Sequence, residues 1–141
     1  QVQDSIAKGA TCLLGGEIPS QQGAWYPATL LTDVCEGMPA YHEELFGPVA
    51  SVIKVKDTAE AIKVANDSVY GLGGGVFTQN IAEGERIAKE EMTTGSVYVN
   101  GFVRSNPRLP FGGVKESGYG RELSEEGIRA FTNMKTVVVQ S

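Results

Sequence analysis

The stretch "PVASVIKVKDTAEAIKVANDSVYGLGGGVFTQNIAEGERIAKEEMTTGSVYVNGF", residues 48–102, alternates short apolar runs with helical patterns. The predicted strands are 48–56, 71–78 and 95–102, and the predicted helices are 57–68 and 80–92. The first helix is expected to have Asp57 as its N-cap, because Glu60 stands three residues further on, as in a capping box. Strands that alternate with helices at this spacing are typical of a parallel sheet with crossover helices. The stretch therefore predicts an α/β fold class.

Both flanks of this stretch add elements to the predicted fold. Residues 1–16, "QVQDSIAKGATCLLGG", predict the end of a helix, with Gly9 as its C-cap, followed by a short strand. The remaining predicted elements are a strand at 25–34, a helix at 121–134 and a last strand at 135–140. Because a domain rarely opens within an element, we expect the sequence to be a fragment of a longer chain.

Composition argues against several classes of function. Of the 141 residues, 41% are hydrophobic, which suffices for one domain with a buried core. The formal net charge of −5, without a basic stripe, argues against a nucleic-acid partner. The longest apolar runs, such as "VVV" at 137–139, are far too short for a membrane span, and no signal segment is visible. Two cysteines and one histidine disfavour a disulfide framework and a zinc cluster, so a cytoplasmic protein without a metal site is predicted.

The glycine-rich stretch "LPFGGVKESGYGREL", residues 109–123, raises the question of a phosphate-binding loop. A Walker loop needs Ser or Thr after its lysine, where this sequence has Glu116. The dinucleotide pattern G-x-G-x-x-G also fails, because Leu123 stands at the third glycine position, and the similar run at 71–76 fails in the same way. Structural turns and the wall of a functional site both remain open on these residues alone.

Two long motifs, "EELFGPV" at 43–49 and "PFGGVKESGYGRE" at 110–122, stand on either side of "GSVYVNG" at 95–101. In this order they resemble the C-terminal signatures of the NAD(P)-dependent aldehyde dehydrogenase superfamily and the strand that leads into its substrate loop. The resemblance covers essentially the whole chain. It implies the C-terminal part of the family's parallel-sheet catalytic domain at 1–134 and an oligomerisation strand at 135–141.

The form of residues 103–122, "VRSNPRLPFGGVKESGYGRE", is most similar to the succinate-semialdehyde dehydrogenase branch of that family. The resemblance implies oxidation of an aldehyde to a carboxylic acid through a cysteine thioester, with succinate semialdehyde as the expected substrate. It also implies a homo-oligomer, a dimer or a tetramer, assembled through Lys135–Gln140. An exposed apolar strand at the end of the chain would otherwise be an aggregation liability.

The cofactor implied by the resemblance is NAD or NADP. Glu44 matches the family's glutamate that binds the nicotinamide ribose, since a carboxylate can accept hydrogen bonds from two adjacent hydroxyls. Phe46 matches the aromatic residue that packs beside the nicotinamide, and Gly47-Pro48 forces an extended approach to the following strand. The alternative is that Glu43 and Glu44 are solvated loop acids. The choice between NAD and NADP depends on a ribose-2′ contact in a domain outside the matched region.

The substrate residues implied by the resemblance lie before and within the glycine-rich stretch. Phe111 matches the aromatic lining of the aldehyde tunnel, so this stretch is expected to be an active-site wall. Ser105 matches the serine that donates a hydrogen bond to the distal carboxylate, and Arg104, Asn106 and Arg108 are nearby donors. The alternative is a set of surface turn residues, and the family's main carboxylate-binding arginines lie upstream of the matched region.

Four charged residues of the glycine-rich stretch are expected to act structurally. We expect ion pairing and helix capping to hold the loop and to start the next helix. The four residues are Lys115, Glu116, Arg121 and Glu122.

The resemblance implies no catalytic residue in this chain, because the family's nucleophilic cysteine, general-base glutamate and cofactor domain all lie upstream. Cys12 and Cys35 lack the nucleophile's sequence context and are expected to be ordinary thiols, and His42 is expected to be a loop residue. We therefore predict that the 141-residue chain alone is inactive. A non-catalytic binding or scaffold module derived from the same fold is the alternative.

Overall fold

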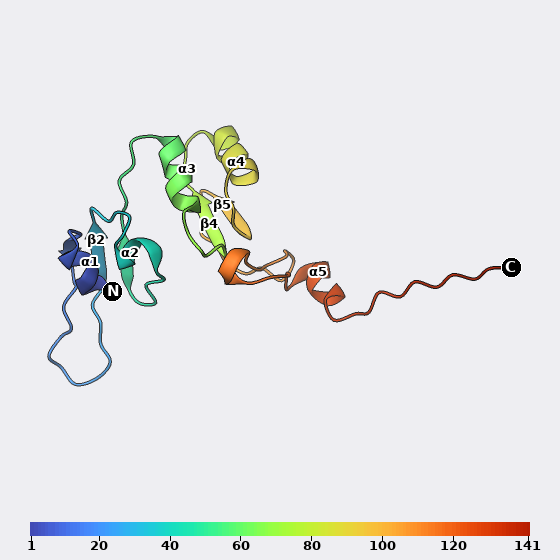
Figure 1. Ribbon diagram of the computed structural model, residues 1–141, viewed down its shortest axis with the longest axis horizontal. Helices are drawn as coiled ribbons and strands as arrows, with labels where there is room; N and C mark the ends of the chain where they lie inside the picture. The colour runs from blue at the N-terminus through green and yellow to red at the C-terminus, as the bar shows by residue number, and fades with distance from the viewer. The chain divides into compact units, whose positions relative to one another are not determined.

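In the computed structural model, residues 1–141 form two units, Gln1–Glu60 and Ala61–Ser141 (Figure 1). The first unit contains α1 Val2–Ala7, β1 Thr11–Leu14, β2 Thr29–Thr32, α2 Pro39–His42 and β3 Val49–Ser51. Helix α3, Thr58–Asn66, follows. The second unit then contains β4 Gly73–Val76, α4 Ile81–Glu90, β5 Ser96–Val99, the 3₁₀ turn η1 Lys115–Ser117 and α5 Ser124–Arg129.

The first unit is built on a three-stranded sheet with the order β1-β2-β3. Strand β2 is antiparallel to β1 and parallel to β3. Leu31, in the central strand, is fully buried, as expected for a strand that is covered on one face. The other members of the buried core come from the helices and loops of the same unit, namely Val2, Ala10, Val34, Met38 and Ala40.

Helix α1 ends in a Schellman motif, which explains the glycine at position 9. Gly9 adopts a φ of +111°, and its N–H donates to the carbonyl of Ile6 at 3.0 Å. The N–H of Ala10 donates to the carbonyl of Ser5, also at 3.0 Å, which completes the motif. The predicted helix end at Gly9 is confirmed, with Lys8 as the formal C-cap.

Helix α3 begins as its capping pattern predicts. The carboxylate of Asp57 accepts a hydrogen bond from the N–H of Glu60 at 2.8 Å. The carboxylate of Glu60 accepts from the N–H of Lys56 at 2.7 Å, one residue before the N-cap. The reciprocal arrangement of a capping box is therefore present, shifted by one residue on the glutamate side.

The second unit contains a β-α-β crossover. Strands β4 and β5 are parallel and in continuous register from Gly73↔Ser96 to Val76↔Val99. Helix α4 connects them, and a Cβ on its Gly84 would lie 2.9 Å from the side chain of Val99, so the helix packs closely on the sheet. The predicted parallel pairing with a crossover helix is confirmed for these two strands.

The strands predicted within residues 48–102 belong to one sheet in each unit. Strand β3 pairs with β2 in the first unit, and β4 pairs with β5 in the second. The strands are also shorter than the apolar runs that predicted them, because only part of each run forms hydrogen bonds with a neighbouring strand.

The C-terminal region departs from the sequence-based prediction in two ways. The helix predicted at 121–134 is confined to Ser124–Arg129, because Leu123 and Ser124 adopt positive φ of 63° and 51° and so prevent an earlier start. Residues 135–140 form no strand, since no other part of the chain pairs with them, and Val137–Val139 are exposed.

The helices are all too short or too polar to cross a membrane.

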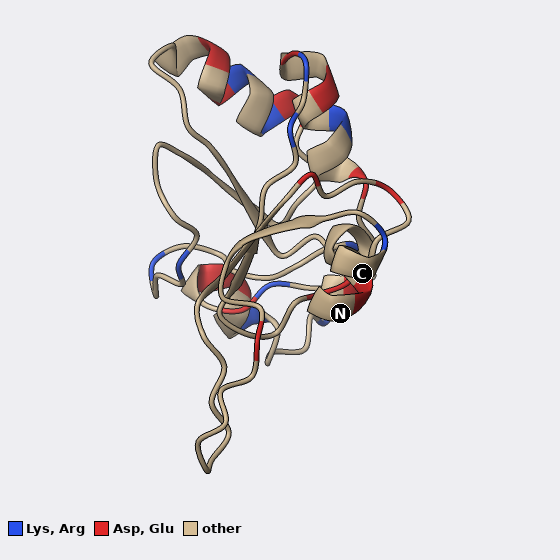
Figure 2. Cartoon of the chain, turned by 90° about the vertical axis from the view of Figure 1, so that its left-hand side faces the viewer, with Lys and Arg blue, Asp and Glu red and all other residues tan.

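Helix α4 carries an ion-pair network on its exposed side. The Arg86 guanidinium lies 2.7 Å from the carboxylate of Glu83 and also pairs with Glu91, while Lys89 pairs with Glu85 at 3.1 Å. The hydrogen bond from Arg86 lowers the pKa of Glu83, and the bonds to Glu83 and Glu91 raise the pKa of Arg86. Figure 2 shows acidic and basic residues interspersed along the helices in this way. Such exposed pairs each stabilise a helix only slightly.

Candidate functional sites

The segment that carries the predicted cofactor residues connects α2 to β3. Successive tight turns shape it, with the N–H of Gly47 donating to the carbonyl of Leu45 and the N–H of Val49 donating to that of Gly47, both at 2.8 Å. The carbonyl of Pro48 accepts from the N–H of Thr29 at 2.8 Å, which fixes the end of the segment to the central strand β2. The segment is therefore held at one end by the sheet.

The two adjacent acids of this segment differ in their hydrogen bonding. The carboxylate of Glu43 accepts a hydrogen bond from the side-chain amide of Gln1 at 2.7 Å. The same amide reaches only the backbone carbonyl of Glu44, at 3.1 Å, and the Glu44 carboxylate is exposed without a hydrogen bond. Glu44 is therefore the member of the pair that is available to a ligand's hydroxyl groups.

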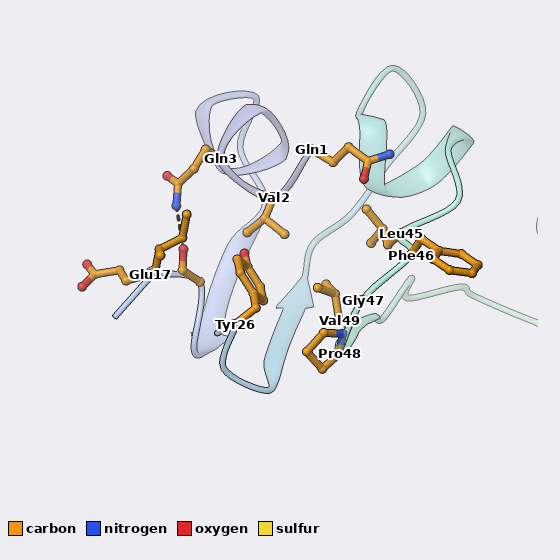
Figure 3. A pocket seen from close by; sticks show the side chains of 12 residues that line it. Gln1, Val2, Gln3, Glu17, Tyr26, Leu45, Phe46, Gly47, Pro48 and Val49 are labelled. Carbon is orange, nitrogen blue, oxygen red and sulfur yellow. Dashed lines mark hydrogen bonds between the residues drawn. The ribbon is translucent and has the colours of Figure 1, made fainter. Parts of the chain in front are cut away.

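A pocket of about 850 Å³ lies in the first unit beside this segment (Figure 3). Its lining residues come from α1, from the loop after β1 and from the approach to β3: Gln1, Val2, Gln3, Gly16, Glu17, Ile18, Tyr26, Leu45, Phe46, Gly47, Pro48 and Val49. Phe46 is part of this lining and is 93% exposed, whereas Glu44 lies outside the lining. The volume and the mostly apolar lining suit part of a nucleotide cofactor.

A second, smaller pocket of about 340 Å³ lies in the second unit. Its lining residues come from β5 and from the loop that follows it: Ser96, Val97, Tyr98, Arg104, Asn106, Leu109, Pro110 and Phe111. Three of the predicted substrate residues, Arg104, Asn106 and Phe111, are therefore brought together. Ser105 and Arg108 are exposed on the same loop and do not line the pocket.

The glycine-rich stretch forms a closed loop that positions Phe111. Phe111 and Glu122 form an antiparallel bridge at its neck, with N···O distances of 2.9 Å and 2.7 Å. Inside the loop, the guanidinium of Arg121 donates to the carbonyls of Gly113 and Gly120 at 3.0 Å and 2.6 Å. Phe111 thus belongs to a braced backbone and lines the second pocket, and its role as the wall of an active site stays a prediction.

Lys115 and Arg121 hold the loop, but not by the predicted ion pairing. The ammonium group of Lys115 donates to the carbonyls of Asn66 and Ser68 at 2.9 Å and 2.8 Å, next to the C-terminal end of α3. None of the ion pairs in the structure involves Lys115, Glu116, Arg121 or Glu122. Helix α5 also has no side-chain N-cap. Backbone carbonyls therefore take the place of the expected acidic partners.

Sequence reasoning missed the contribution of β5 to the second pocket. Ser96 and Tyr98 both line it, and the hydroxyl of Tyr98 donates to the carbonyl of Arg104 at 3.1 Å. Val97, which stands between them, also lines the pocket, so the alternation in "SVYV" does not by itself indicate which strand residues contribute to it. No motif in the sequence indicated which group accepts the hydrogen bond from the Tyr98 hydroxyl.

The cysteines and the histidine show no nucleophile or metal centre. The thiol of Cys12 donates to the carbonyls of Leu14 and Gly15 at 3.3 Å and 3.6 Å. Cys35 is an exposed free thiol. His42 ends helix α2 and accepts from the N–H of Gly37 at 3.1 Å, so the expectation of a loop residue is wrong. No group of three His, Cys, Asp or Glu residues is placed to hold a metal ion.

Known proteins resemble the chain over nearly all of its residues. The family model described as "Aldehyde dehydrogenase family" matches residues 1–137. The succinate-semialdehyde dehydrogenase (NADP+) of Deinococcus radiodurans is 54% identical over 137 residues, which make up 97% of this chain and 28% of that protein.

Solved structures share the fold described above. The Mycobacterium tuberculosis aldehyde dehydrogenase complexed with NAD+ has a TM-score of 0.91 and 38% identity, over 99% of this chain and 29% of that one. A salicylaldehyde dehydrogenase from Pseudomonas putida G7, complexed with salicylaldehyde, has a TM-score of 0.86 and 43% identity, over 94% of this chain and 27% of that one. The chain spans less than a third of the length of these relatives.

Proposed function

The chain belongs to the aldehyde dehydrogenase family, and we propose that the whole enzyme containing it oxidises succinate semialdehyde to succinate with NAD or NADP. The observation that carries this proposal is the pocket in which Arg104 and Asn106 meet Phe111. Polar donors beside an aromatic wall suit a short aldehyde that ends in a carboxylate. The name of the 54% identical Deinococcus radiodurans relative supports the same substrate.

The first unit is proposed to orient the cofactor. A bound nicotinamide cofactor would supply the hydride acceptor for the oxidation. The free carboxylate of Glu44 accepts hydrogen bonds from the adjacent ribose hydroxyls, while the Glu43 carboxylate remains bonded to Gln1. The ring of Phe46, which is 93% exposed, offers an apolar surface to the nicotinamide. Glu44 and Phe46 suit a nicotinamide riboside chemically, because a carboxylate that can accept hydrogen bonds from hydroxyl groups stands two positions before an exposed aromatic ring.

The second unit is proposed to bind the aldehyde. Phe111 lines the apolar part of the binding site, and the donors at Arg104 and Asn106 bind the distal carboxylate together with Ser105. Ser105 lies between these two donors on the same exposed loop, so its hydroxyl group is accessible to a ligand. A charge-assisted hydrogen bond to the carboxylate favours succinate semialdehyde over an uncharged aldehyde of the same length.

The reaction is proposed to pass through a thioester on a cysteine outside these residues. The surroundings of Cys12, which donates to two carbonyls, favour a structural thiol. The contribution of this chain is therefore orientation and specificity. Orientation is a large part of catalysis, because a displacement of about 1 Å can cost on the order of 100-fold in rate.

The enzyme is further proposed to be a dimer or a tetramer assembled through Lys135–Gln140. Val137, Val138 and Val139 are 74%, 75% and 88% exposed, so this apolar segment has no cover within its own chain. A strand from a neighbouring subunit would cover the apolar side chains of this segment and would pair with its backbone N–H and C=O groups.

An activity assay tests the proposed function. The formation of reduced cofactor is followed for the whole enzyme and for the 141-residue chain alone, with succinate semialdehyde and either NAD or NADP. We expect turnover by the whole enzyme and none by the chain alone. A whole enzyme that oxidises butanal but not succinate semialdehyde would contradict the substrate, and turnover by the chain alone would contradict the division of roles.

A further inference from the structure

Tyr98 contacts both the second pocket and the loop that bears the predicted substrate residues. It lies on β5, is half-buried and lines the pocket together with Phe111. Its hydroxyl group donates a hydrogen bond to the backbone carbonyl of Arg104 at 3.1 Å. Because that bond is made to the backbone, it fixes the path of the loop regardless of where the Arg104 side chain points.

The loop after β5 is firmly held at both of its ends. At its start, the side chain of Asn100 exchanges two hydrogen bonds of 2.8 Å with the backbone of Thr78. At its far end, the N–H of Leu109 donates to the carbonyl of Asn106 at 2.9 Å, and the carbonyl of Pro107 accepts from Ser124 at 3.0 Å. These bonds leave the middle of the loop to be held by other contacts.

The middle of the loop, residues 102–105, has three anchors. Two are apolar: the ring of Phe102 lies 5.5 Å from that of Phe77, and Val103 packs against β4, where a Cβ on Gly73 would lie 2.7 Å from the valine side chain. The third is the bond from Tyr98 to Arg104, and the structure contains no other hydrogen bond to residues 102–105. Ser105 directly follows this hydrogen-bonded anchor, which is the one nearest to it, so its position depends on Tyr98.

We propose that Tyr98 is a positioning residue for recognition of the substrate's carboxylate, acting through the Arg104–Asn106 segment. This inference rests on the proposed function, because it explains how the second pocket would select an aldehyde that carries a carboxylate. The phenol is suited to this task, since a ring with two side-chain torsions loses little freedom when its hydroxyl group is fixed. The ring also packs beneath Gly101, where a Cβ would lie 3.3 Å from Tyr98 Cδ1.

The expected effect of losing the hydroxyl group follows from the strength of one hydrogen bond. A net contribution of about 0.5–1.5 kcal/mol corresponds to a factor of roughly 2 to 13 in the population of the ordered loop. Only that ordered loop presents its donors to the carboxylate. The loss therefore falls on the KM for succinate semialdehyde, while kcat and the KM for an uncharged aldehyde change little.

The test uses Tyr98→Phe in the whole enzyme, with Tyr70→Phe as the matched control. Tyr70 is also a half-exposed tyrosine of the second unit, but its hydroxyl group makes no hydrogen bond and it lies outside the pocket. We expect Tyr98→Phe to raise the KM for succinate semialdehyde about 2- to 13-fold with an unchanged kcat, and Tyr70→Phe to change neither constant. Amide hydrogen exchange should become faster in residues 102–105 only in Tyr98→Phe.

Two outcomes would overturn the assignment. One is an unchanged KM in Tyr98→Phe, whether or not exchange in residues 102–105 becomes faster, and the other is an equal rise in KM for succinate semialdehyde and butanal. A wild-type enzyme that does not oxidise succinate semialdehyde would instead contradict the proposed function itself. Because Tyr98→Phe keeps the ring, a folded variant is expected, and circular dichroism of both variants checks this.

Discussion

Gly95 and Gly112 approach so closely that a Cβ on Gly95 would lie 1.7 Å from the carbonyl oxygen of Gly112. Gly95 directly precedes β5, and Gly112 directly follows Phe111 in the glycine-rich loop. The N–H of Gly95 also donates to the carbonyl of Gly71 at 3.0 Å, which in turn accepts from Val114 at 3.0 Å. The start of β5 therefore packs directly against the loop that carries Phe111, one of the residues that line the second pocket.

Gly95→Ala is predicted to destabilise the protein through this contact. The added methyl group meets backbone atoms that cannot rotate away, and overpacking of this kind costs about 1–3 kcal/mol. Gly47→Ala is the control, because a Cβ there meets nothing within 4 Å. Urea unfolding of the whole enzyme should show a lower midpoint for Gly95→Ala than for Gly47→Ala, and equal midpoints would show that the loop yields without cost.

Glu44→Gln is predicted to slow hydride transfer without unfolding the protein. A neutral amide is a weaker acceptor for two ribose hydroxyls, and misplacement of the nicotinamide by about 1 Å can cost on the order of 100-fold. Single-turnover measurement of reduced cofactor in the whole enzyme gives the rate. Glu43→Gln is the control, since the Glu43 carboxylate is bonded to Gln1. An unchanged rate in Glu44→Gln would remove Glu44 from the cofactor site.

Deletion of residues 136–141 is predicted to disrupt the oligomer of the whole enzyme. The exposed valines of this segment have no cover in their own chain, so a neighbouring subunit is the expected partner. Light scattering gives the mass before and after the deletion. If the deleted protein kept both its mass and its unfolding midpoint, the segment would not be an intersubunit strand.

Arg86→Met is predicted to lower stability at neutral pH but not at acid pH. The hydrogen bond from Arg86 lowers the pKa of Glu83 in the folded protein, so the interaction is present above the ordinary glutamate range and is lost as the carboxyl group is protonated below it. The difference in Tm between wild type and Arg86→Met should therefore shrink as the pH falls below about 4. A difference independent of pH would mean that the loss comes from packing of the side chain.

The helices at 57–68 and 80–92 could be predicted because their signals are local. Asp57 and Glu60 supply the start of α3, and Asn80 accepts from the N–H of Glu83 at the start of α4. Such capping bonds join residues only a few positions apart, so the sequence alone indicates them.

Strand partners could not be predicted in the same way, because pairing joins distant residues. The apolar runs at 48–56 and 71–78 look alike, but the first pairs with β2 and the second with β5. The run at 135–140 has the same apolar character and pairs with nothing in this chain. The side chains of a run therefore indicate a strand without indicating its neighbour.

Some residues of the second pocket could be predicted because long motifs lie beside them in the sequence. The resemblance led to Arg104, Asn106 and Phe111, which meet in one pocket. Tyr98 was missed because a tyrosine in an apolar run looks like an ordinary core residue, and its hydroxyl group finds its acceptor on a loop six residues later. Every residue has a backbone carbonyl, so a sequence motif cannot indicate which of them accepts a hydrogen bond from a distant side chain.

The most direct test of the proposed specificity is the ratio of kcat/KM for succinate semialdehyde to that for butanal, measured in the wild-type enzyme and in Ser105→Ala. Loss of a hydrogen bond to a charged group costs about 1.5–3 kcal/mol and should lower this ratio roughly 13- to 160-fold, while kcat/KM for butanal is preserved. Arg108→Ala removes an exposed cation from the same loop, so it separates the hydrogen bond of Ser105 from the general charge of the loop and should leave the ratio closer to that of the wild type. Equal losses for both aldehydes in Ser105→Ala would show that Ser105 shapes the loop and does not bind the carboxylate.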